Sequence, residues 1–341
     1  PIPSHIPSTA QPPMTTTSRT SGQTDPFAGR HVYMIGIGGC GMSGLARMLR
    51  TRAASVAGSD KEASDVTEAL TREGIAVGFD QSKREIPQTA DLIIASAAVR
   101  AEHPQVLAAK DRGLPVLLYA EALGMSMIGR TGVAIAGTHG KSTTTAMLGA
   151  TLTDCGLDPT VIVGATCRQL RRGSLSGAND EPGGFRLGNE KIPAGTMAGK
   201  PGLLLAEACE FNRSFHNLRP VIGSISSVEA DHLDIYGSLD AVVESFHQFA
   251  QRIAPASAGG RLLIAHDGAH RREVTRGLDC AIETIGYTPE ADWTISYDPR
   301  SRQTTLTHDR ERIAEWISPI PGAHNATNAA TALALSVMLG A

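Results

Sequence analysis

Two short glycine-rich segments constrain the fold of this chain more than any other feature. Residues 36–41 (GIGGCG) follow the apolar run HVYMI, residues 137–142 (GTHGKS) follow the apolar run GVAIA, and each segment leads into a helix-like stretch. Glycines at such a junction let backbone N–H groups and the positive end of the helix approach an anion closely. Two junctions of this kind predict two successive α/β units, each built on a parallel sheet.

The surrounding pattern predicts a tail followed by two domains. Residues 1–29 are rich in Pro, Ser and Thr, and we predict a disordered tail there. Residues 30–127 alternate apolar and helical runs, which predicts a Rossmann-like parallel-sheet domain. Residues 128–341 are predicted to form a central, P-loop ATPase-like α/β domain. Within it, strand-like pieces between 262 and 317 would extend the sheet, and the glycine-rich residues 171–202 would form a long loop or a short hairpin.

Composition excludes two classes of partner. The 341 residues are enough for two hydrophobic cores, and the formal net charge of −3 gives no indication of nucleic-acid binding. No apolar run reaches the roughly 18 residues that a membrane helix needs, so we expect no membrane association. Five cysteines stand singly, without the spacing of a metal or disulfide motif. This usage favours a reducing, cytoplasmic location.

The first glycine-rich turn is a candidate diphosphate site. It has the G-x-G-x-x-G spacing, and Asp60 lies at the end of the next strand, near the offset of about 20 residues at which an acid commonly meets a ribose. The pattern suits NAD and a nucleotide sugar equally well, and a tight turn without any ligand is the structural alternative. A nicotinamide-dependent dehydrogenase would use this turn but would leave the second one unexplained.

The second turn has the chemistry of a nucleoside triphosphate loop. Its glycines expose backbone amides, Lys141 can place an ammonium on the β and γ phosphates, and the Ser142 hydroxyl can bind Mg²⁺. The loop is shorter than the general G-x-x-x-x-G-K-[ST] pattern because residue 135 is Ile. The residues predicted to bind the triphosphate are Gly137, Thr138, His139, Gly140, Lys141, Ser142 and Thr143.

Acidic and histidine side chains follow two further apolar runs. Glu207 ends the run LLLAE, and His232 belongs to the segment DHLD after VIGSISSVEA. Ligands of parallel sheets sit at the carboxyl ends of the strands, and phosphoryl transfer requires a cation that neutralises the moving phosphate. A lone Glu or His is usually structural, but beside a phosphate loop we predict Ser142, Glu207 and His232 as metal ligands and Lys141, Glu207 and His232 as catalytic residues.

A last polar cluster opens an alanine-rich helix after the Pro-Gly turn at 321–322. His324, Asn325 and Asn328 carry groups able to hydrogen-bond an adenine or ribose edge. Helix capping by asparagine is the alternative interpretation.

The chain resembles the Mur ligase family from about residue 30 to the last residue. The resemblance rests on four motifs in this order: GIGGCGMSG, GTHGKSTTT, EACE with DHLD, and GAHNATNAA. The opening GIGGCGMSGLA, the Ser59-Asp60 pair and the histidine of GTHGKS resemble the branch that adds the first residue to UDP-N-acetylmuramate. The resemblance implies an ATP-dependent ligase with a UDP-sugar domain, a central ATPase domain and a C-terminal domain. The third domain is absent from this sequence, so we expect a fragment.

The resemblance also implies substrates and contacts. L-alanine would be joined to UDP-N-acetylmuramate with ATP and Mg²⁺, through an acyl phosphate that the amine attacks. Ser142 replaces the Thr more usual in this branch, and Ser227 stands where an Asn commonly precedes the DH pair. Two alternatives stay open: a ligase that attaches an intact tripeptide to the same UDP-sugar, and a chain that binds both nucleotides without turnover. The predicted UDP-sugar contacts are Gly38, Gly39, Gly41, Met42, Ser43, Asp60 and Ser96.

Overall fold

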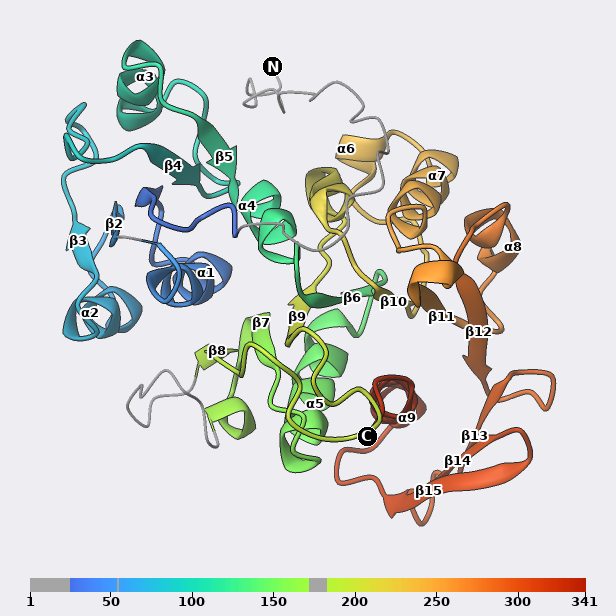
Figure 1. Cartoon of the computed structure of the whole chain (residues 1–341). Coiled ribbons are helices and arrows are strands. Elements are labelled where there is room, and N and C mark those ends of the chain that lie inside the picture. The colour runs from blue at the N-terminus through green and yellow to red at the C-terminus, as the bar shows by residue number, and fades with distance from the viewer. Residues whose placement is uncertain (1–24, 54, 172–182) are drawn as a thin grey trace. The chain divides into compact units, whose positions relative to one another are not determined.

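A computed structural model describes residues 25–53, 55–171 and 183–341. The chain divides after Gly129 into two compact units, and each is described by itself. The predicted boundary, between residues 127 and 128, lies two positions from this division. Both units are α/β, as the sequence predicts (Figure 1).

The first unit is a five-stranded, fully parallel sheet in the order β3-β2-β1-β4-β5. Its central strand reads HVYMI, and four of these five residues are buried because helices cover both faces of the sheet. The elements are β1 (His31–Ile35), α1 (Cys40–Arg50), β2 (Ser55–Ser59), α2 (Asp65–Arg72), β3 (Ala76–Gly78), β4 (Leu92–Ala95), α3 (Pro104–Asp111), β5 (Val116–Leu118) and α4 (Tyr119–Ser126).

Local sequence explains where these helices begin. The α2 helix starts after Ser64, whose hydroxyl accepts from the Thr67 amide while the Thr67 hydroxyl accepts from the Ser64 amide. This reciprocal capping satisfies amides that the first turn leaves free. The α1 helix has Gly39 at its N-cap and no side chain there. Its first amides are therefore left to the backbone and to any ligand of the glycine-rich turn.

The prediction of a disordered tail is wrong for residues 25–29. Residues 1–24 lie outside the described part of the chain, but residues 25–29 form a turn in which the Phe27 side chain is fully buried. The Phe27 amide donates to Asp25 Oδ1 at 2.9 Å, and the Arg52 guanidinium lies 3.5 Å from the same carboxylate. A single aromatic residue within a polar segment is enough to anchor these five residues to the first unit.

The second unit contains a ten-stranded sheet in the order β15-β14-β13-β12-β11-β10-β6-β9-β7-β8. Its centre, from β7 to β13, is parallel, and the edges are antiparallel: β8 pairs with β7, and β14 and β15 form a hairpin beside β13. The strands are β6 (Thr131–Ala136), β7 (Thr160–Cys167), β8 (Gly183–Arg186), β9 (Leu203–Glu207), β10 (Ile222–Ile225), β11 (Arg261–Ala265), β12 (Ala281–Gly286), β13 (Trp293–Tyr297), β14 (Gln303–His308) and β15 (Glu311–Ile317).

Helices cover both faces of this sheet. The α5 and α9 helices pack side by side on one face, and α7 and α8 lie on the other (Figure 1). Leucines of both α5 and α9 join apolar side chains of β6, β7 and β9 in one core, whereas Phe215, Phe246 and Phe249 pack together on the opposite side. The helices are α5 (Lys141–Asp154), η1 (Arg168–Arg171), η2 (Phe211–Asn217), α6 (Leu233–Tyr236), α7 (Leu239–Ala250), η3 (Ala256–Ala258), α8 (Arg271–Thr275) and α9 (Ala323–Met338).

The sequence made two further predictions about the strands and loops of this unit. The strand-like pieces between 262 and 317 do extend the sheet, as β11 to β15. Of the glycine-rich segment 171–202, residues 172–182 lie outside the described ranges, and the part that follows them enters the sheet as β8 before a bridge between Lys191 and Pro201.

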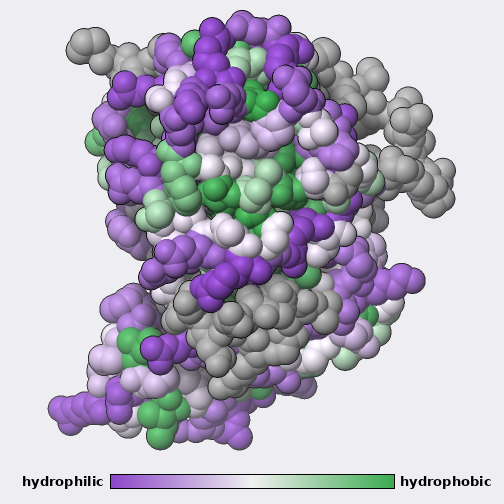
Figure 2. All heavy atoms as spheres, turned by 90° about the vertical axis from the view of Figure 1, so that its left-hand side faces the viewer, coloured by the Kyte–Doolittle hydropathy of each residue, from purple (hydrophilic) through white to green (hydrophobic). Residues whose placement is uncertain are grey.

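Hydrophilic residues are the most frequent on the face drawn in Figure 2, and hydrophobic ones form small groups among them. Along the described ranges, every helix is too short or too polar to cross a membrane.

Candidate functional site

The second glycine-rich turn joins β6 to α5 and has a backbone that only glycine adopts easily. Gly137 and Gly140 have φ angles of 134° and 83°. A Cβ on Gly137 would lie 2.1 Å from Ser226 Oγ, and one on Gly140 would lie 2.5 Å from Asn328 Oδ1. Both glycines therefore permit a positive φ and a close approach of neighbouring chain.

The carboxyl end of β10 holds this loop from the side. The Thr138 amide donates to the Ser227 carbonyl at 3.0 Å, the His139 amide donates to Ser227 Oγ at 3.2 Å, and Ser226 Oγ donates to the His139 carbonyl at 2.6 Å. Ser227, which departs from the residue usual in the resembling family, thus makes its own contact with the loop. The His139 side chain is exposed and lies 3.7 Å from the Glu229 carboxylate.

Lys141 bends back over its own loop. Its ammonium donates to the Gly137 carbonyl at 2.7 Å, to the Thr138 carbonyl at 3.2 Å and to Glu210 Oε1 at 2.9 Å. The lysine and glutamate side chains are 13% and 4% exposed, so this is a largely buried ion pair. Glu210 is a candidate site residue that the sequence analysis did not single out.

Ser142 lies in the first turn of α5 and meets the end of β9. Its hydroxyl donates to Glu207 Oε1 at 2.8 Å, and Glu207 Oε2 accepts from the Gly164 amide at 3.0 Å. The predicted metal ligands Ser142 and Glu207 are therefore brought together. A hydroxyl and a carboxylate are hard oxygen donors of the kind that Mg²⁺ prefers.

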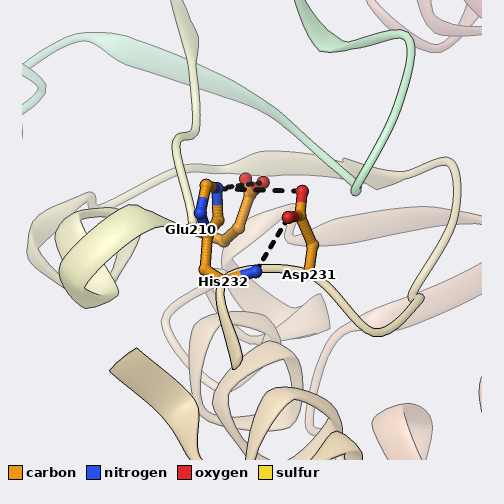
Figure 3. A group of neighbouring side chains, drawn as sticks. All are labelled: Glu210, Asp231 and His232. Atoms are coloured by element: carbon orange, nitrogen blue, oxygen red, sulfur yellow. Dashed lines mark hydrogen bonds and ion pairs between the residues drawn. The ribbon is translucent and has the colours of Figure 1, made fainter. Parts of the chain in front are cut away.

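His232 lies beside two carboxylate side chains, those of Glu210 and Asp231 (Figure 3). One candidate ligand atom from each of Glu210, Asp231 and His232 lies within 4.8 Å of the other two. Among the described residues, these three form a group that could hold a metal ion. His232 Nε2 is 3.9 Å from Glu210 Oε1 and 3.7 Å from Asp231 Oδ2. We predicted a site shared by His232 and Glu207; the structure instead places His232 against Glu210.

The donor set of this group fits a divalent cation. Glu210 Oε2 is buried and receives no hydrogen bond of good geometry from the described residues, although Lys141 Nζ lies 2.9 Å away. Two carboxylates and an imidazole can coordinate Mn²⁺ or Zn²⁺ as well as assist a Mg²⁺ site. Together with the Ser142–Glu207 pair, the chain presents two sets of cation ligands beside one lysine.

Neighbouring side chains contact this group of Glu210, Asp231 and His232. The Tyr236 hydroxyl donates to the Glu210 carbonyl at 2.5 Å and lies 3.3 Å from Ser245 Oγ. Burial raises the pKa of Tyr236, so the hydroxyl stays a donor at neutral pH. Phe211 packs edge-on against the His232 ring, with 5.2 Å between ring centroids.

Of the three predicted polar residues at the start of α9, Asn328 contacts the residues of the loop and α5. Asn328 reaches the loop, where its Oδ1 accepts from the Thr144 hydroxyl at 3.3 Å. Asn325 instead donates from its side-chain amide to the Pro321 carbonyl at 2.8 Å; this is a local contact and not a helix cap, because the N-cap of α9 is Gly322 without a side-chain cap. His324 is exposed on the first turn of the helix.

In the first unit, the predicted pair of turn and acid is in direct contact. The Gly38 amide donates to Asp60 Oδ2 at 2.6 Å, and Asp60 Oδ1 accepts from the Lys61 amide at 2.7 Å. A Cβ on Gly38 would lie 2.9 Å from that carboxylate, so glycine is required for the contact. A Cβ on Gly41 would lie 2.6 Å from the Tyr119 hydroxyl, so this glycine is required for packing as well.

Two of the predicted substrate contacts have buried side chains. Met42 and Ser43 are 3% and 4% exposed, because they lie on the buried face of α1. The Ser43 hydroxyl donates to the Cys40 carbonyl of its own helix at 3.0 Å. Neither side chain is available to a ligand. Ser96 follows β4 and is half-buried beside Gly36, at the carboxyl edge of the sheet.

Comparison with known proteins places both units in one family. The model of the Mur ligase family, catalytic domain, matches residues 31–131, and that of the Mur ligase middle domain matches residues 135–336. The chain is 38% identical to the UDP-N-acetylmuramate–L-alanine ligase of Kineococcus radiotolerans and 36% identical to that of Streptomyces coelicolor, over 91% and 92% of its residues. It spans 62% and 64% of the length of these relatives.

Solved structures share the fold. A UDP-N-acetylmuramate–alanine ligase from Thermotoga maritima superposes with a TM-score of 0.70 over 91% of this chain and 65% of that one. A UDP-N-acetylmuramate:L-alanyl-γ-D-glutamyl-meso-diaminopimelate ligase from Neisseria superposes with a TM-score of 0.75 over 92% of this chain and 95% of that one. Both are 23% identical to it, so the likeness concerns the fold alone.

Proposed function

Because the chain belongs to the Mur ligase family, we propose that it serves the ATP-dependent joining of L-alanine to the carboxylate of UDP-N-acetylmuramate, a step of peptidoglycan biosynthesis. The proposal concerns the activity named for its relatives, of which the chain spans 62% to 64%. Those relatives carry the L-alanine name, which favours this substrate over an intact tripeptide.

The observation that carries the proposal is the cluster around the phosphate loop. Lys141, Ser142, Glu207 and Glu210 meet through hydrogen bonds and an ion pair at the carboxyl ends of neighbouring strands. In parallel sheets this edge is where ligands bind. An ammonium, a hydroxyl and two carboxylates that meet at one glycine-rich loop are the groups that binding of phosphate and Mg²⁺ requires.

In the proposed reaction the protein aligns groups and supplies no nucleophile. The amides of the loop and the Lys141 ammonium would bind the β and γ phosphates. A divalent cation held by Ser142 and Glu207 would neutralise charge on the terminal phosphate, and His232 would act from its group with Glu210 and Asp231. The substrate carboxylate would take that phosphoryl group, and the amine of L-alanine would then displace phosphate from the acyl phosphate.

The first unit would bind the UDP-sugar at the carboxyl edge of its sheet. Gly38 and Asp60 are in contact there, and Gly39 opens α1 with amides that a diphosphate can accept from. Asp60 would meet the ribose or the base. The five cysteines are all free, which supports the cytoplasmic location that we propose.

The test is phosphate release from Mg·ATP, measured with and without UDP-N-acetylmuramate and L-alanine, beside a Lys141→Ala variant. Release that needs both substrates and is lost in the variant is the expected result. Binding of both nucleotides by calorimetry without release would make the chain a binding unit that requires further sequence for turnover. Failure to bind either nucleotide would remove the proposal altogether.

A further inference from the structure

The Lys141 ammonium has no free hydrogen-bond donor in the described structure. An ammonium has three N–H groups, and the acceptors around Nζ are the Gly137 carbonyl, the Thr138 carbonyl and the Glu210 carboxylate. A phosphate oxygen can therefore reach Lys141 only by displacing one of these acceptors. Glu210 is the only charged one of the three, so it decides how strongly the lysine is held back.

The Glu210 carboxylate is not free to follow the lysine. Its own backbone carbonyl is anchored by the Tyr236 hydroxyl at 2.5 Å, and its side chain is 4% exposed. Moving Lys141 onto a phosphate would thus leave a buried carboxylate without its counter-charge. Breaking a buried ion pair in this way is strongly unfavourable unless another cation takes the vacated place.

A second set of candidate cation ligands lies beside the same carboxylate. His232 Nε2 and the Asp231 carboxylate lie with Glu210 in one group, and their ligand atoms are within 4.8 Å of one another (Figure 3). A divalent cation bound there would replace the positive charge that Lys141 withdraws. Glu210 faces both the lysine and the candidate cation ligands.

We propose that Glu210 is a positioning residue that makes nucleotide binding depend on the divalent cation: it holds Lys141 back in the empty loop and releases it when a cation takes over its carboxylate. The inference rests on the proposed nucleotide-binding function of the loop. It assigns Glu210 a role in the exchange of partners, distinct from that of Glu207, which faces the Ser142 hydroxyl.

The test compares nucleotide affinity with and without the cation. Binding of the non-hydrolysable ATP analogue with a β,γ-imido bridge is measured by calorimetry in Mg²⁺ and in excess chelator, for the unchanged chain and for Glu210→Gln. The variant removes the charge that retains Lys141 and repels phosphate. We expect its metal-free affinity to rise by about tenfold or more, which corresponds to about 1.4 kcal/mol, and the gain produced by Mg²⁺ to shrink by a similar factor.

Glu283→Gln is the matched control. Glu283 is also a mostly buried, ion-paired carboxylate of the second unit, held by Arg261 and by the Trp293 indole N–H at 2.7 Å, but it lies on β12 away from the loop. Its substitution should leave the ratio of the two affinities unchanged. Glu210→Asp keeps the charge but retracts it from Lys141, so it should raise metal-free affinity by a smaller factor and provides a second variant if Glu210→Gln does not fold.

An unchanged or weaker metal-free affinity, in whichever Glu210 variant folds, overturns the inference. Lys141→Ala separates this outcome from failure of the proposed function. If Lys141→Ala retains full affinity in Mg²⁺, the loop is not the nucleotide site and the proposed function fails. If Lys141→Ala loses affinity while Glu210→Gln keeps the original ratio, only the exchange role of Glu210 is excluded.

Discussion

The hydroxyl of Ser142 donates a hydrogen bond of 2.8 Å to Glu207 Oε1, although the two residues are 65 positions apart in the chain. Ser142 lies in the first turn of α5, and Glu207 ends β9. Because β9 pairs directly with β6, the strand that leads into the loop, the sheet itself brings hydroxyl and carboxylate together. A cation between them would bridge the loop and the neighbouring strand.

Removing the Ser142 hydroxyl should weaken that cation site. We expect Ser142→Ala to lower the apparent Mg²⁺ affinity by about 10- to 100-fold, the range typical of lost metal-site contacts, and Ser142→Thr to keep it because the hydroxyl is retained. The measurement is phosphate release as a function of Mg²⁺ concentration at saturating ATP. Equal Mg²⁺ dependence of all three proteins would show that Ser142 takes no part in holding the cation.

Gly140→Ala should destabilise the loop by more than the energetic cost of the positive φ at residue 140 alone. Gly140 has a φ of 83°, and an added Cβ would lie 2.5 Å from Asn328 Oδ1. The positive φ costs about 1 kcal/mol or somewhat more for alanine, and displacement of Asn328 adds to this. We expect a lower melting temperature and loss of nucleotide binding, followed by thermal unfolding and calorimetry.

Gly277→Ala is the control for the backbone term of that prediction. Gly277 has a φ of 61°, with nothing within 4 Å of an added Cβ. The Gly277→Ala variant should have a slightly lower melting temperature and an unchanged nucleotide affinity. Comparable affinity losses in the two variants would mean that the contact with Asn328 is irrelevant.

Asp60→Asn should affect the UDP-sugar and not ATP. The carboxylate accepts from the Gly38 and Lys61 amides at 2.6 Å and 2.7 Å. In the variant, a neutral side-chain amide takes the place of this charged acceptor. Hydrogen bonds to charged groups contribute about 1.5 to 3 kcal/mol, so we expect UDP-N-acetylmuramate to bind at least about tenfold more weakly. Calorimetry with each nucleotide checks this, and ATP affinity serves as the internal control. A uniform loss for both ligands would indicate misfolding instead.

Stability of the second unit should fall in mild acid because of His216. Burial lowers the pKa of His216 from its ordinary 6.5, the charges of Arg252 and Arg213 lower it further, and the Ser245 carbonyl opposes the shift. Since the folded pKa lies below the unfolded one, the unfolded chain takes up a proton first as the pH falls. The stabilising contribution is therefore complete above about pH 6.5 and is lost as the pH falls toward the folded pKa.

The corresponding measurement is urea unfolding between about pH 7.5 and 5.5, for the unchanged chain and for His216→Gln. The unchanged chain should lose stability over this range, and the variant should show a shallower slope because it lacks the titrating group. Identical slopes would mean that His216 does not contribute to the acid dependence.

Much of the fold follows from local pattern. The strands that precede the two turns, the helices that follow them, the helix near Ser64 and the α9 helix after the Pro-Gly turn were all predictable, because strand and helix periodicity and capping are properties of adjacent residues. Phe27 escaped prediction because one aromatic residue in a polar segment has no periodicity to reveal it. Met42 and Ser43 were assigned to the ligand because a motif gives spacing but not the direction in which each side chain of α1 points.

The sequence by itself determined which groups the second glycine-rich turn offers, since its glycines, the Lys141 ammonium and the Ser142 hydroxyl all lie within residues 137–142. Only the tertiary structure decided which groups meet that loop. The strand order β10-β6-β9 places Ser226 and Ser227 on one side of it and Glu207 and Glu210 on the other. Pairing between strands so distant in the chain depends on the packing of the whole sheet, which no local pattern encodes; for that reason the partner of Lys141 became visible only in the folded chain.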